Sequence, residues 1–128
     1  CVEGVEVVLT AVPTPEPILT EALLDSVNYV AVIAGDGRTR QVASEVLEGR
    51  SVVVDVLEQA QKSGEMRFAD ATGRLAQIRL ARGEDGEVLT MGDAACGRLG
   101  DTASVVYLTG MGALDLCAAA MISRRSTT

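Results

Sequence analysis

Four short runs of apolar, largely β-branched residues recur along the chain, and they constrain its fold more than any other feature. Each contains at most one charge: residues 5–12 (VEVVLTAV), 29–34 (YVAVIA), 51–56 (SVVVDV) and 103–108 (ASVVYL). Runs that lack a polar residue at every second position are typical of strands covered on both faces, as in parallel sheets. Because helix-forming segments separate the runs, we predict an α/β fold with a mostly parallel sheet flanked by helices.

The segments between these runs predict the helices. We expect helices over residues 20–26, 43–47, 57–62, 66–80 and 112–123. Thr20 suits an N-cap, Gly64 suits a helix C-terminus, and Gly73 interrupts the fourth helix. The last segment is rich in alanine and apolar nearly all round, which predicts burial or packing against a partner.

Length and composition bound the class of protein. With 128 residues, 48% of them hydrophobic, the chain is expected to form one domain with a sizeable core. A net charge of −7 argues against a nucleic-acid partner, which needs a basic surface. No apolar run reaches the ~18–20 residues of a membrane span, and no signal peptide is visible. Three cysteines without metal spacing fit a reduced, cytoplasmic protein, and the lack of histidine excludes a histidine-based triad and the common zinc sites.

Three aspartates are candidate functional residues. Asp36 follows the second run between two glycines, at the carboxyl end of a predicted parallel strand, where open α/β sheets bind ligands. An Asp-Gly turn explains the same residues, and from the residues alone turn chemistry is the favoured interpretation. Asp55 is assigned to capping the helix from Leu57. The sequence spacing does not indicate that Asp36 lies near Asp55 or Asp115 in the fold. A complete enzyme that uses Asp36 together with one of these two residues is therefore the last-ranked hypothesis.

Two further motifs have a structural interpretation beside the functional one. Residues 110–115 (GMGALD) follow a predicted strand and resemble the dinucleotide fingerprint G-x-G-x-x-G/A. Their sixth position is Asp115, and too few residues follow for a ribose-binding acid, so a glycine-rich turn into a helix is the better explanation. Cys96 has no histidine partner, which favours an unreactive cysteine over an activated thiol.

Several stretches, taken in order, resemble the ornithine cyclodeaminase/μ-crystallin family over nearly the whole chain. They are residues 7–19 (VVLTAVPTPEPIL), 29–66 (with AGDGRTR, VVVD, EQA and GE), 86–89 (GEVL), 96–98 (CGR) and 105–123 (VVYLTGMGALDLCAAAMIS). The resemblance covers only the C-terminal part of the family's NAD(P)-binding Rossmann domain. It implies that the substrate domain and the glycine fingerprint lie upstream, and that residues 1–128 are a single partial domain.

The resemblance also implies a chemistry. The family's cofactor is NAD or NADP and its substrates are amino or imino acids, in cyclodeamination (a lyase reaction) or imine reduction (an oxidoreductase reaction). Asp36 matches the family's acid/base aspartate. The cofactor contacts implied by position are Thr10, Ala11, Val12, Val32, Ala34 and Leu108. Ala34 stands where the family has glycine, Tyr107-Leu108 stands where it usually has Lys-Ser, and no metal site is expected.

Two functions from different classes stay open. The first is the distal half of an NAD(P)-dependent cyclodeaminase-like protein, inactive alone because the pyrophosphate loop and the substrate-binding lysine and arginines would lie upstream. The second is a small α/β binding or oligomerisation module that keeps the fold without the chemistry. Because a partial sheet exposes a strand edge, we expect a homo-oligomer or association with a missing N-terminal half.

Overall fold

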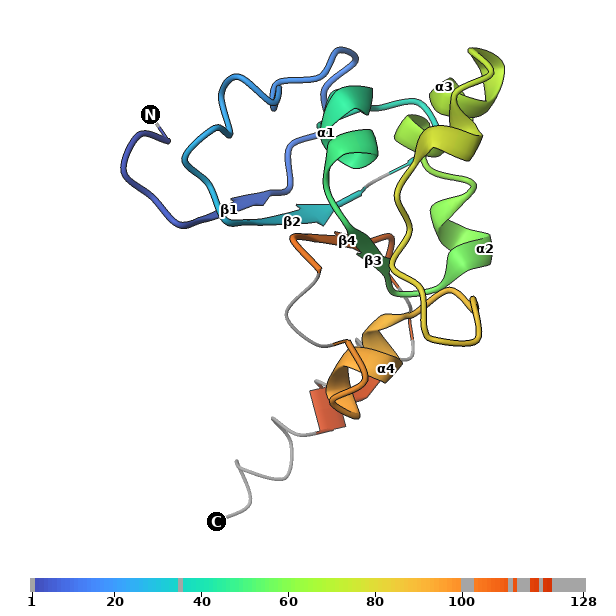
Figure 1. The fold of residues 1–128 in the computed structure, drawn as a ribbon. Helices are drawn as coiled ribbons and strands as arrows, with labels where there is room; N and C mark the ends of the chain where they lie inside the picture. The colour runs from blue at the N-terminus through green and yellow to red at the C-terminus, as the bar shows by residue number, and fades with distance from the viewer. Residues whose placement is uncertain are drawn as a thin grey trace.

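The computed structural model of the chain describes residues 2–34, 36–99, 103–110, 112, 116–117 and 119–120. Four strands form one all-parallel sheet (Figure 1). They are β1 (Val7–Thr10), β2 (Tyr29–Ile33), β3 (Val52–Val54) and β4 (Val105–Leu108), in the order β1-β2-β4-β3. The predicted α/β class and its parallel sheet are confirmed, since each strand lies within one of the four apolar runs.

Parallel pairing brings the last residues of all four strands to one end of the sheet, which we call the carboxyl end. Thr10 of β1 pairs with Val32 of β2, and Tyr107 of β4 pairs with both Val32 and Val54. The loops that leave the strands therefore start side by side, in the place where open α/β sheets bind ligands.

Short helices connect and flank the strands. They are α1 (Ser44–Gly49), α2 (Leu57–Ala60), α3 (Gly64–Ala71), the 3₁₀ helix η1 (Leu75–Gln77) and α4 (Met91–Ala95). Residues 21–26 form successive turns instead of the predicted helix. The helix predicted over residues 66–80 is divided, because Gly73 adopts φ +70° between α3 and η1. Most of the predicted 112–123 helix lies outside the described residues, and the described residues within it are helical.

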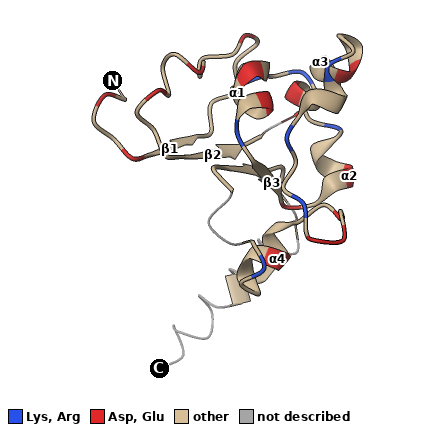
Figure 2. Ribbon diagram, in the orientation of Figure 1, with Lys and Arg blue, Asp and Glu red and all other residues tan. Residues whose placement is uncertain are grey.

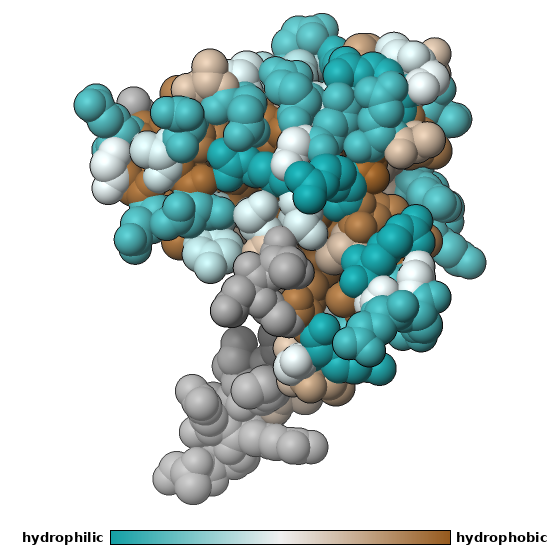
Figure 3. Space-filling view, viewed as in Figure 1, coloured by the Kyte–Doolittle hydropathy of each residue, from teal (hydrophilic) through white to brown (hydrophobic). Residues whose placement is uncertain are grey.

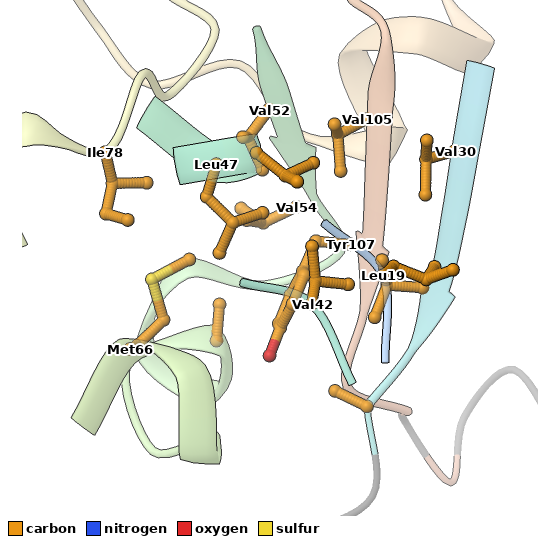
Figure 4. Packing of buried hydrophobic residues seen from close by; sticks show 14 of the residues in the cluster. Leu19, Val30, Val42, Leu47, Val52, Val54, Met66, Ile78, Val105 and Tyr107 are labelled. Atoms are coloured by element: carbon orange, nitrogen blue, oxygen red, sulfur yellow. The ribbon is translucent and has the colours of Figure 1, made fainter. Parts of the chain in front are cut away.

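One face of the sheet is fully covered. It packs against α1, α2 and α3 in the main hydrophobic core, which Figure 4 shows around Tyr107, Leu47 and Met66. The strand residues in this core are Val30, Val32, Val52, Val54, Val105 and Tyr107. They alternate along each strand with residues of the opposite face, as the pleat of a sheet requires.

The opposite face is covered over only part of its width. At β3 and β4, Val53 packs against Leu89 and Ala81, with Val106 and Met91 of α4 beside them. At β1 and β2, four residues stay exposed: Val7 by 61%, Leu9 by 65%, Tyr29 by 50% and Ile33 by 43%. We call these four residues the apolar patch. Apolar surface shows between polar side chains at this end of the molecule (Figure 3).

Charged side chains are spread over the loops and helices, with acidic and basic residues interspersed (Figure 2). None of the helices built from described residues combines the length and the hydropathy needed to cross a bilayer.

Candidate functional site

A cavity of about 260 Å³ opens at the carboxyl end of the sheet. Its walls come from the loop after β2, the loop after β4 and the turn between α2 and α3. The lining residues are Ala34, Asp36, Gly37, Gln59, Lys62, Ser63 and Thr109. Two opposite charges, those of Asp36 and Lys62, therefore face the same small space.

Asp36 is held as an anion by its own turn. Its Oδ1 accepts hydrogen bonds from the backbone amides of Arg38 and Thr39 at 2.8 and 3.1 Å, and its Oδ2 accepts from the Arg38 guanidinium at 3.0 Å. The backbone amide of Arg38, followed by its guanidinium, holds the pKa of this carboxyl below its usual range. An ionised, 44% exposed carboxylate at the cavity can bind an ammonium group or accept a proton.

Two glycines fasten the Asp36 loop to the start of α3. The Gly64 amide donates to the carbonyl oxygen of Asp36 at 3.1 Å. A Cβ at Gly64 would collide with the carbonyl oxygen of Thr39, and one at Gly37 would lie 2.8 Å from that of Lys62. The prediction that Gly64 ends a helix is therefore wrong: this glycine begins α3 and is needed for the close approach of the loop.

Asp55 has a different role from the predicted helix cap. Its Oδ2 accepts hydrogen bonds from the amides of Thr109 and Gly110 at 2.8 and 2.9 Å, and its Oδ1 accepts from the Thr109 hydroxyl at 2.9 Å. The N-cap of α2 is Val56, and no side chain caps that helix. Asp55 thus joins the end of β3 to the turn after β4, and the capping assignment is corrected.

The same bonds bear on the glycine-rich segment after β4. A phosphate cradle needs free backbone amides that point at the ligand. The amides of Thr109 and Gly110 already donate to Asp55, and Gly110 adopts φ +85°, which fits a turn. The preference for a turn over a dinucleotide fingerprint agrees with these contacts, although residues 111 and 113–115 lie outside the described residues.

The structure brings only some of the predicted site residues together. Ala34 lines the cavity with Asp36, whereas Thr10 and Val32 are buried at the ends of β1 and β2. Ala11 and Val12 are exposed beyond β1, outside the cavity lining, and Leu108 is half-buried at the end of β4. Sequence reasoning missed Gln59, Lys62, Ser63 and Thr109. The strand-end argument that selected Asp36 would have found Thr109, which directly follows β4, but not Gln59, Lys62 and Ser63, which lie in α2 and in the turn after it.

The remaining candidates from the sequence are Cys96, a metal site and Asp115. Cys96 is a free, exposed cysteine. Within the described ranges, no three residues of the types His, Cys, Asp and Glu are grouped so that they could hold a metal ion. Asp115 lies outside the described residues.

A parallel α/β sheet that gathers polar side chains around a cavity at its carboxyl end defines the Rossmann-like class of ligand-binding domains. Within this class the family is identified by the sequence. The family model described as "Ornithine cyclodeaminase/mu-crystallin family" matches residues 1–128, and the chain belongs to this family.

Solved structures agree on the fold. A probable ornithine cyclodeaminase from Bordetella pertussis Tohama I is 25% identical with a TM-score of 0.58, over 83% of this chain and 34% of that one. An archaeal alanine dehydrogenase dimer with bound NAD is 24% identical with a TM-score of 0.58, over 83% of this chain and 33% of that one. The chain thus spans about a third of the length of these two structures. No protein with a curated description matches it.

Proposed function

We propose that this chain is the substrate-facing part of the cofactor domain of an NAD(P)-dependent enzyme, which acts on amino or imino acids by cyclodeamination or imine reduction. Asp36 is its acid/base residue. The observation that carries the proposal is an ionised carboxylate beside the cavity at the carboxyl end of the sheet, in a chain of this family. The similarity to a probable ornithine cyclodeaminase and to an alanine dehydrogenase with bound NAD supports both the substrate class and the cofactor.

The charges of the cavity suit an amino acid. An α-amino acid carries an ammonium and a carboxylate, and the cavity presents Asp36 and Lys62 as the complementary pair. In this proposal Asp36 accepts a proton from the substrate ammonium, and returns it to the nitrogen when the direction of the reaction is reversed. Gln59 lines the same space and can hydrogen-bond the substrate, whereas the Ser63 hydroxyl already donates to the carbonyl oxygen of Ala60.

The described residues fit one end of the cofactor. NAD(P) would supply the group that accepts or donates a hydride. Ala11 and Ala34 have small side chains and Val12 is 48% exposed, so we place the nicotinamide beside the ends of β1 and β2. The amides of Thr109 and Gly110 do not fit the pyrophosphate, because they are bound to Asp55. We therefore expect the pyrophosphate site outside the described residues, and no turnover by these 128 residues alone.

An NMR titration of the chain tests the proposal. NADH and ornithine, added separately, should shift the backbone amide resonances of Gly37, Lys62 and Ser63. Asp36→Asn should weaken ornithine binding about fivefold or more, because it removes the charge that faces the ammonium. Asp70→Asn, at an exposed aspartate on α3, is the matched control and should bind like the wild type. If neither ligand shifts these resonances at millimolar concentration, the proposed site is wrong.

The apolar patch favours a second function, which is assembly with another copy of the chain. The patch consists of three aliphatic residues and one tyrosine, so the net charge of −7 does not oppose contact there. The similar archaeal alanine dehydrogenase is a dimer. Sedimentation should then show a dimer that Leu9→Glu converts to a monomer, while Leu23→Glu, at an exposed leucine outside the sheet, leaves it intact. A monodisperse monomer at high concentration would contradict this function.

The proposal also places the protein in the cytoplasm. Cys96 and Cys117 are free and exposed, as is usual for proteins in a reducing compartment. Protein isolated from its native cells under thiol-blocking conditions should run without disulfide-linked species on a non-reducing gel. Native disulfides would contradict this location.

A further inference from the structure

Two polar side chains are buried directly behind the carboxyl end of the sheet, and neither lines the cavity. Gln41 is 2% exposed and Glu65 is 4% exposed. Burying such groups is costly unless each polar atom is hydrogen-bonded. Their hydrogen bonds extend to three of the four strands or to the residues that follow them directly.

The Gln41 amide connects the ends of β1 and β2. Its Oε1 accepts hydrogen bonds from the Thr10 hydroxyl at 2.7 Å and from the Val12 amide at 2.9 Å. Its Nε2 donates to the carbonyl oxygen of Ile33 at 2.6 Å. The orientation of the amide is determined by its partners, because a backbone amide can only donate and a carbonyl can only accept.

Glu65 extends the connection to β4. Its Oε1 accepts from the backbone amide of Gln41 at 2.6 Å, and its Oε2 accepts from the Tyr107 hydroxyl at 2.5 Å. Burial raises the pKa of the Tyr107 hydroxyl above its ordinary value, so the hydroxyl keeps the proton that it donates to Glu65. The ends of β1, β2 and β4 are therefore linked through two adjacent buried side chains.

We propose that Gln41 is a positioning residue: its side-chain amide sets the separation between the chain leaving β1 at Val12 and the chain leaving β2 toward Asp36. The proposal rests on the proposed function, in which the cofactor lies against the first segment and the substrate against the second. Gln41 touches neither ligand. It fixes the distance between the places where they bind.

Glutamine suits this task for a chemical reason. The position needs one acceptor toward β1 and one donor toward β2, and the amide group supplies both from one rigid plane. An ionised glutamate at position 41 would keep the acceptor and lose the donor. A protonated glutamate has both again, so Gln41→Glu makes the link to Ile33 dependent on pH.

The experiment compares Gln41→Glu with the wild-type chain by amide NMR and NADH titration at pH 8 and pH 5.5. At pH 8 the variant should shift the resonances of Ala34, Gly37 and Arg38 and bind NADH about tenfold more weakly. At pH 5.5 both differences should diminish, because burial and the neighbouring Glu65 carboxylate favour protonation of the new carboxyl. Gln77→Glu, at an exposed glutamine in η1, is the control and should behave like the wild type at both pH values.

A second variant keeps the proposal testable if Gln41→Glu does not fold. Thr10→Val keeps the core volume and removes one donor to Gln41, so it should shift the resonances of Val12 and also of Ala34 and Gly37. Shifts confined to β1 and residue 41 in both variants, or a Gln41→Glu difference that does not depend on pH, would overturn the proposal. If wild-type protein binds no NADH, the proposed function fails, whereas the amide shifts still decide whether Gln41 couples the two strand ends.

Discussion

Asp36 and Asp55 follow apolar strands at the same end of the sheet, yet they are bound in opposite ways. Asp36 is exposed, and its donors are Arg38 and Thr39 of its own turn. Asp55 is 7% exposed, and its donors include the Thr109 amide, 54 residues further along the chain. A carboxylate with distant donors holds the fold together, whereas one with local donors can exchange them for a ligand. Two aspartates at similar sequence positions therefore have different roles: Asp55 stabilises the fold, whereas Asp36 remains available to bind a ligand.

Removal of the Asp55 carboxylate should have the largest effect on stability. Asp55→Ala leaves the amides of Thr109 and Gly110 without their acceptor, which should lower the free energy of unfolding by about 3 kcal/mol. Urea denaturation measures this loss. Asp70→Ala, at an exposed position on α3, should change stability by about 0.5 kcal/mol or less. Equal effects of the two substitutions would show that Asp55 does not fasten β4.

The contact between the Asp36 loop and α3 comes next in size. Gly64→Ala forces a methyl group against the carbonyl oxygen of Thr39, which should cost about 2 kcal/mol of unfolding free energy. A Cβ at Gly49, the last residue of α1, meets no atom within 4 Å. Gly49→Ala is thus the matched control, with an expected gain of about 0.5 kcal/mol in the same urea experiment. An unaffected Gly64→Ala protein would mean that the loop is not held closely.

The buried hydroxyl of Tyr107 should stabilise the fold at neutral pH, and this stabilisation should be lost at alkaline pH. Tyr107→Phe leaves Glu65 without one donor and should cost about 1.5 kcal/mol. Because the folded-state pKa of Tyr107 is raised above its ordinary value of 10.0, the wild-type chain should lose stability as the pH rises above about 10. Urea unfolding between pH 7 and 11 should show a weaker alkaline loss for Tyr107→Phe than for the control Tyr29→Phe. Parallel pH profiles for the two variants would contradict this assignment.

Asp36→Asn should have the smallest effect on folding. Asparagine keeps an oxygen that can accept from the turn amides but loses the charge that faces Arg38, so the urea midpoint at neutral pH should fall only slightly below that of the wild type. The lowered pKa of Asp36 contributes stability that is present above pH 3.8 and is lost as the pH falls through the folded-state value. Circular dichroism during acid titration should therefore show less acid sensitivity in the variant. Loss of folding at neutral pH would show that the turn requires the carboxylate.

The sequence predicts the sheet well because the information is local. Each apolar run, such as residues 51–56, contains its own evidence for a buried strand. Asp36 is also placed correctly at the carboxyl end, since its position follows from the end of β2. The predicted parallel sheet is confirmed by registers such as that of Thr10 with Val32 between β1 and β2.

What the sequence does not predict depends on distant partners. Asp55 is compatible with a helix cap over a few residues, and only the folded chain brings the turn after β4 within hydrogen-bond distance. Gly64 is similarly ambiguous, because glycine serves helix ends and close contacts alike, and Thr39 decides between them. Gln41 and Glu65 gave no signal, since a buried polar side chain is recognised by its partners and not by its neighbours in sequence.

The strand order has a consequence for how the protein is made. β4 is the last of the four described strands in sequence, yet it lies between β2 and β3 and pairs with both. In the sheet that the structure describes, the β1–β2 pair and β3 are joined only through β4. Until the ribosome releases residues 105–108, these two parts of the sheet therefore remain separate. The sheet therefore closes late, through contacts between distant parts of the chain, which form slowly and leave apolar strands open to other chains meanwhile.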